Sequence, residues 1–63
     1  GDTFDLRFLN AMIAHHEEGI LMTTETRQKS SRAEILDNAD AVEVFLKNGI
    51  QTLQGFRAEW FNL

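Results

Sequence analysis

The chain contains no cysteine and no proline, and both absences bear on its fold. Without cysteine, no disulfide can stabilise this chain of 63 residues. A chain of that length buries only about 60% of the surface that its unfolded state exposes. Small chains without disulfides commonly depend on a metal ion or on association with a partner. Without proline, nothing interrupts a helix at any point along the sequence.

Two further deficits exclude classes of function. The net charge is −4 and the lysines and arginines are scattered, so the positive surface that nucleic-acid binding requires is missing. No apolar run approaches the ~20 residues of a membrane-spanning helix, and the chain itself shows no signal-peptide pattern. We therefore predict no nucleic-acid partner and no membrane span.

The residue patterns of several catalytic sites are also absent. The chain has no cysteine nucleophile, and its two adjacent serines, Ser30 and Ser31, fall in a predicted turn remote from the histidines. His16-Glu17-Glu18 lacks the second histidine of a zinc-protease helix. The Glu-x-x-His pairs of a di-iron bundle do not occur. The sequence therefore predicts a protein that is not an enzyme.

Two long amphipathic segments account for nearly all of the chain. The first runs from about residue 4 to residue 28, and its apolar residues cover about 200° of a helical wheel. The second runs from about residue 32 to residue 62. Its apolar residues alternate at spacings of four and three: Ile35, Ala39, Val42, Leu46, Gly49, Leu53, Phe56, Trp60 and Leu63. This heptad pattern is typical of packed helices.

A short turn separates the two predicted helices. Ser31 with Glu34 three residues later forms a capping-box pattern, which predicts that the second helix starts there. Asp2 or Thr3 is expected to cap the first helix. A connection this short makes the helices antiparallel. The predicted fold is therefore all-α, an antiparallel two-helix hairpin forming one domain over residues 1–63.

A single hairpin leaves much of the apolar arc of the first helix in water. The simplest arrangement that covers it is a homodimer of hairpins, which makes a four-helix bundle. The expected core of that bundle is Phe8, Met12, Ile13, Ile35, Val42, Leu46, Leu53 and Phe56. Antiparallel packing gathers Phe4 and Phe8 with Phe56, Trp60 and Phe61 at one end. Gly19 and Gly49 lie in the seams, where they allow close helix contact or make room for the histidines.

The first helix also carries the chain's soft metal ligands. Met12, His15, His16 and Met22 fall within eleven residues on one broad side of the helix. Thioether and imidazole are ligands that Cu(I) and Ag(I) prefer, and imidazole also binds Cu(II). Met22 lies too far along the helix from His15 to share an ion within one chain, so a second chain would complete the site. Glu18 is placed to orient the imidazole of His15.

The pattern of the first helix resembles the family called domain of unknown function 305. The resemblance rests on Asp5-x-x-Phe8-Leu9-x-x-Met12-Ile13-x-His15-His16, followed by Gly19 and Met22, and on Trp60 at the position of the family's closing tryptophan. It implies a ferritin-like antiparallel helical bundle in a periplasmic or secreted protein, and some members bind copper through Met and His. Where the family commonly has Gln, Glu and Met, this chain has Leu46, Gly49 and Leu53.

Two functions are consistent with the sequence. One is a non-enzymatic module that binds copper or silver ions through Met12, His15, His16 and Met22. The other is a metal-free dimerisation or protein-interaction module that retains the family fold.

Overall fold

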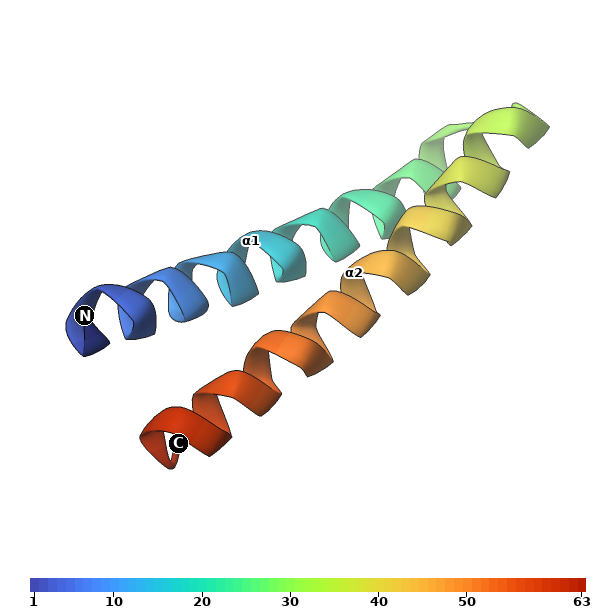
Figure 1. Ribbon diagram of the computed structural model, residues 1–63. Helices are drawn as coiled ribbons and strands as arrows, with labels where there is room; N and C mark the ends of the chain where they lie inside the picture. The colour runs from blue at the N-terminus through green and yellow to red at the C-terminus, as the bar shows by residue number, and fades with distance from the viewer.

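The computed structural model describes residues 1–63 and contains two helices and no strand. Helix α1 spans Asp2–Lys29, helix α2 spans Ala33–Phe61, and residues 30–32 connect them. The helices lie antiparallel in a hairpin of 45 × 15 × 14 Å, close together at the turn and farther apart at the termini (Figure 1). The predicted all-α hairpin is confirmed. Neither helix has an apolar stretch long enough to cross a membrane.

Both predicted N-terminal caps are wrong. Helix α1 begins at Asp2, and its capping residue is Gly1, which has no side chain to offer. Helix α2 is capped by Arg32 and not by Ser31, and no side chain bonds to its first turn. The Ser31–Glu34 capping box therefore does not form.

The turn itself explains why α2 starts late. The Ser30 hydroxyl oxygen accepts the backbone N–H of Arg32 at 3.3 Å. Arg32 is still extended, with φ −78° and ψ 124°, and its carbonyl accepts the N–H of Leu36 at 3.0 Å. A hydroxyl bonding to the backbone two residues on is a turn-forming contact that competes with a helix cap. At the other end of α2, Asn62 ends the helix in the left-handed conformation, a common terminator.

The hairpin buries very little. Only four residues are buried: Leu9, Ile13, Thr23 and Ala39. Thr23 is accommodated because its hydroxyl donates to the Ile20 carbonyl oxygen at 2.7 Å. Of the predicted bundle core, Ile13 is buried and Met12, Leu46 and Leu53 are half-buried, whereas Phe8, Ile35, Val42 and Phe56 are exposed. One neighbouring helix covers only part of the apolar arc of α1.

Two glycines set the distance between the helices. A Cβ atom added to Gly19 would lie 2.7 Å from Leu46 Cδ1, and one added to Gly49 would lie 2.8 Å from both Cδ2 and Nε2 of His16. Both spacings are far below van der Waals contact. The expectation that glycine allows close contact and makes room for a histidine is confirmed.

Polar side chains also join the helices. Near the turn, Arg27 donates from Nε to Asp40 Oδ1 at 2.9 Å and from an Nη to Glu43 Oε1 at 2.7 Å. The hydrogen bond to Asp40 and the charge of Glu43 together raise the pKa of the Arg27 guanidinium. Near the termini, Arg57 donates to Asn10 Oδ1 at 2.9 Å. These contacts fix the register of the hairpin at both ends.

Three glycine-to-alanine substitutions should distinguish the effect of helix propensity on stability from the effect of packing between the helices. Alanine favours a helix over glycine by about 1 kcal/mol. Gly55 has open space around it, so Gly55→Ala should stabilise the protein by about that amount. Gly19→Ala meets only a terminal methyl of Leu46, which can rotate away, so we expect a near-neutral effect. Gly49→Ala meets the His16 ring, and overpacking of this kind costs about 1–3 kcal/mol.

Thermal unfolding followed by circular dichroism would measure the three effects, since 1 kcal/mol moves Tm by roughly 4–8 °C in a domain this small. Gly49→Ala should have the lowest midpoint of the three variants. Adding His16→Ala to Gly49→Ala should recover part of the loss, because the ring that collides is gone. A Gly49→Ala midpoint as high as that of Gly55→Ala would contradict the close contact.

Candidate functional site

His16 lies between the two helices. Its Nδ1 is 2.6 Å from the Met12 carbonyl oxygen, and its ring edge lies over Gly49. A carbonyl oxygen can only accept a hydrogen bond, so Nδ1 carries the proton and donates it. In the neutral ring Nε2 then holds the free lone pair. Metal-binding histidines commonly show this arrangement, in which one ring nitrogen donates to a backbone carbonyl and the other binds the ion.

His15 lies outside the seam between the helices. Its side chain is 70% exposed, and its Nδ1 lies 4.0 Å from Glu18 Oε2. The contact places Glu18 beside the imidazole as expected from the sequence, at a distance longer than a hydrogen bond. Because successive residues of a helix differ by about 100° in direction, the two histidines cannot both enter the same seam.

The two methionines are divided in the same way. Met12 is half-buried one turn before His16, whereas Met22 is 67% exposed near the turn end of the hairpin. The structure thus joins the His16 ring to the backbone of Met12 and leaves His15 and Met22 exposed, apart from that contact. No three His, Cys, Asp or Glu side chains of the hairpin form a group that could hold a metal ion.

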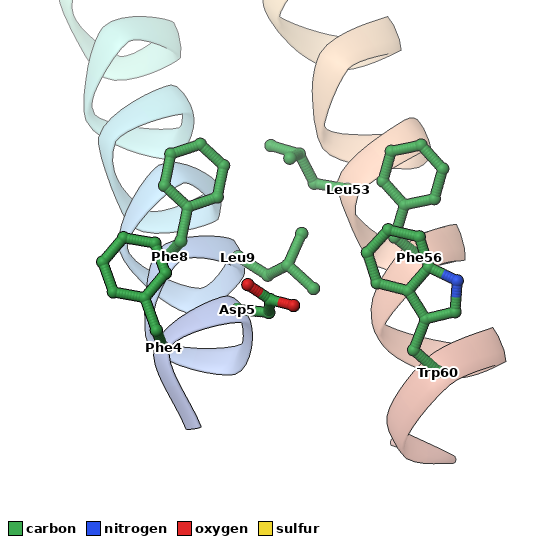
Figure 2. A pocket seen from close by; sticks show the side chains of 7 residues that line it. All are labelled: Phe4, Asp5, Phe8, Leu9, Leu53, Phe56 and Trp60. Carbon is green, nitrogen blue, oxygen red and sulfur yellow. The ribbon is translucent and has the colours of Figure 1, made fainter. Parts of the chain in front are cut away.

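An aromatic hollow lies at the open end of the hairpin. Phe4 and Phe8 line one wall and Phe56 and Trp60 the other, with Leu9 and Leu53 between them (Figure 2). The hollow measures about 380 Å³. The Phe56 and Trp60 rings stack with their centroids 4.7 Å apart and their planes 5° apart. The predicted gathering of aromatic residues at this end is confirmed for Phe4, Phe8, Phe56 and Trp60, whereas Phe61 does not line the hollow.

One residue of the hollow had no predicted role. The Asp5 carboxylate lines it among the apolar side chains (Figure 2). The signal was present in the sequence, since Asp5 lies one helical turn before the buried Leu9 and therefore on nearly the same side of α1.

Two further hollows lie along the hairpin, one of about 380 Å³ lined by Glu17, Ile20, Leu21 and Ile50, and a smaller one of about 230 Å³ near the turn, between α1 and α2. The smaller one is lined by small and medium side chains: Gly19, Met22, Thr23, Thr26, Ile35, Asn38, Ala39 and Val42. The chain therefore offers two kinds of surface, one with soft donor atoms on α1 and one of exposed apolar side chains along both helices.

The chain belongs to the family described as Domain of unknown function (DUF305), which it matches over residues 1–61. The resemblance inferred from the pattern of the first helix is thereby confirmed. Neither a curated protein nor a solved structure matches the chain.

The hydrogen bond of His16 has a spectroscopic consequence. At a pH where both imidazoles are neutral, His16 should be the Nδ1–H tautomer, because Nδ1 donates to the Met12 carbonyl. The exposed His15 ring has no such bond and should favour the Nε2–H tautomer that is usual in water. Two-bond ¹H–¹⁵N correlation spectra distinguish the two tautomers, with His15→Gln and His16→Gln providing the assignments. An Nε2–H tautomer at His16 would contradict the geometry described here.

Proposed function

We propose that this protein is a non-enzymatic metal-ion binding module that takes up copper or silver through Met12, His15, His16 and Met22. The observation that carries the proposal is the hydrogen bond from His16 Nδ1 to the Met12 carbonyl. It orients the ring and leaves Nε2 as the donor atom that an ion would use.

The chemistry of the donor set supports copper or silver over harder ions. The candidates are two imidazoles and two thioethers, which suit Cu(I) and Ag(I), and the chain has no thiolate to favour zinc. His15 and Met22 are exposed, so an ion can reach them without unfolding the hairpin. Glu18, beside His15, is the residue that would orient its ring.

The proposal includes a homodimer. The donors of one hairpin lie on two different sides of α1, so one hairpin presents too few converging ligands to hold an ion tightly. A second α1 would supply further donors beside His15, whereas Met22, about 10 Å along the helix from His15, would be a separate donor. The same association would complete a ferritin-like four-helix bundle and cover apolar side chains that a hairpin leaves in water. By the family resemblance, the protein would act outside the cytoplasm, as a periplasmic or secreted protein.

A competitive titration of the purified protein with Cu(I), with the mass of the complex measured at each step, tests the metal site. We expect one ion per chain or per dimer at nanomolar affinity or better. His15→Ala/His16→Ala should abolish uptake at these concentrations and leave the helical circular-dichroism signal largely unchanged. Met12→Leu and Met22→Leu, which keep the apolar volume, should weaken binding without unfolding the protein.

A matched control comes from Leu21→Ala, which shortens an exposed side chain beside Met22 that has no donor atom. This variant should bind copper as the unaltered protein does. Unchanged stoichiometry in the double histidine variant would remove both histidines from the site.

The second candidate function is a metal-free dimerisation or interaction module. It is favoured by the large exposed apolar residues on both helices and by Gly49, which has no donor atom and lies against His16. A stable dimer that takes up neither Cu(I) nor Ag(I) in the same titration would establish this function in place of the first.

A further inference from the structure

One side of the hairpin carries a stripe of exposed residues, all apolar except His15, which we name the open face. Its members are Phe4, Phe8, His15 and Met22 on α1 and Ile35, Val42, Phe56 and Trp60 on α2. On each helix the series Phe8–His15–Met22 and Ile35–Val42–Phe56 repeats at multiples of seven residues. Such residues stay on one side of a packed helix. The aromatic hollow and the hollow near the turn open on this side, because most of their exposed lining residues are members of the open face, whereas a third hollow, lined by Glu17, Ile20, Leu21 and Ile50, lies off it.

We infer that the open face is an interface for a second copy of this chain, which lies on it turned end for end. In this arrangement α1 packs against α1 of the second copy, α2 packs against α2, and the two turns lie at opposite ends. The inference rests on the proposed homodimer and adds which surface is used and in which orientation.

The positions of the stripes support the orientation. A two-fold axis that reverses a helix must pass through the centre of its contact series. The series on α1 is centred on His15, with Phe8 and Met22 seven residues to either side. On α2, Gly49 is likewise the centre, with Val42 and Phe56 seven residues and the exposed Ile35 and Leu63 fourteen residues to either side. The His16 ring lies over Gly49, so these two centres are at the same level of the hairpin. One axis therefore serves both helices.

Side-chain size favours the same orientation. The hollow near the termini is lined by large aromatic residues, and the hollow near the turn is lined largely by small ones, such as Gly19 and Ala39. Turning the second copy end for end sets large side chains against small ones at both ends, which is how facing layers fill space. The opposite orientation would set aromatic residues against aromatic residues and leave the two small hollows facing each other.

Charge is arranged as an interface requires. None of the residues that make up the open face is Lys, Arg, Asp or Glu, and Asp5 lies at its edge. Charged residues lie along the border instead, as in a protein–protein interface. Arg7 and Glu25 are spaced almost symmetrically about the middle of α1, so reversal brings Arg7 toward Glu25 of the second copy.

The size of the face also fits a second copy. The hairpin is 45 Å long and 15 Å across. A contact over that length approaches the roughly 800 Å² per partner of a stable interface. A partner of the same length and twist covers the whole stripe, whereas a shorter peptide would leave one hollow open.

Disulfide cross-linking tests both the surface and the orientation, because the natural chain has no cysteine. Phe8→Cys and Met22→Cys are purified separately under reduction, mixed, allowed to exchange and then oxidised. Residues 8 and 22 of one chain lie about 21 Å apart along α1, far beyond the ~7 Å limit for a disulfide, so any bond joins two chains. We expect a disulfide between one chain of each variant in the mixture and little linkage in either variant alone.

A mixture of Phe8→Cys with Leu21→Cys is the matched control, because Leu21 is as exposed as Met22 and lies off the face. Linkage no greater than in this control, or linkage of Phe8→Cys with itself, would overturn the inference. Sedimentation of the unaltered protein separates the two levels of the proposal. If the protein sediments as a dimer but the expected disulfide does not form, the assignment of the interface is wrong and the homodimer remains. If it sediments as a monomer, both the homodimer and the interface are wrong.

A valine pair gives a second test that does not depend on oxidation. Val42 is 37% exposed on the open face, and Val44 is 59% exposed on another side of the same helix. Val42→Glu should weaken dimerisation at least tenfold, and Val44→Glu should leave it unchanged, with both variants equally helical. Equal dissociation constants for the two variants would overturn the assignment of the face.

Discussion

The close approach of α1 and α2 where the His16 ring meets Gly49 is the constraint on which the rest of this molecule depends. Because Gly49 has no side chain, the His16 ring fits where a Cβ would otherwise stand, and Leu46 fits against Gly19 in the same way. The seam that results is narrow and holds only residues that point directly across it, such as Leu9 and Ile13. The remaining apolar residues are left on the flank, and this is why so long a hairpin buries so little.

The same narrow seam separates the two histidines. His16 enters it and bonds to the backbone of its own helix, whereas His15 stands on the open face. Adjacent residues of one sequence motif therefore have different surroundings, α2 for His16 and the outside of the hairpin for His15. A metal site and a dimer interface built from these residues would be coupled, since both use the side of α1 that carries His15 and Met22.

Much of the fold could be predicted because it follows from periodicity. The heptad spacing from Ile35 to Leu63 predicted a packed helix, and a short connection left only an antiparallel hairpin. The cap of α2 was mispredicted because Ser30, and not Ser31, bonds to the turn, a choice that depends on backbone geometry. The partners of Arg27 depend on register, which no spacing within one helix reveals. For the candidate site, a helical wheel placed both histidines on one side, but the width of the seam decided which of them enters it.

The polar contacts between the helices differ greatly in the length of chain that they close. Arg27 reaches Asp40 across 13 residues, whereas Arg57 reaches Asn10 across 47. Closing a short loop loses less chain entropy than closing a long one. During folding, contacts between the helices should therefore form first near the turn and last near the termini. In the native state, local opening should begin near the termini. The aromatic end would then be the last part to form and the first to open, so the backbone amides nearest the termini would exchange fastest with solvent.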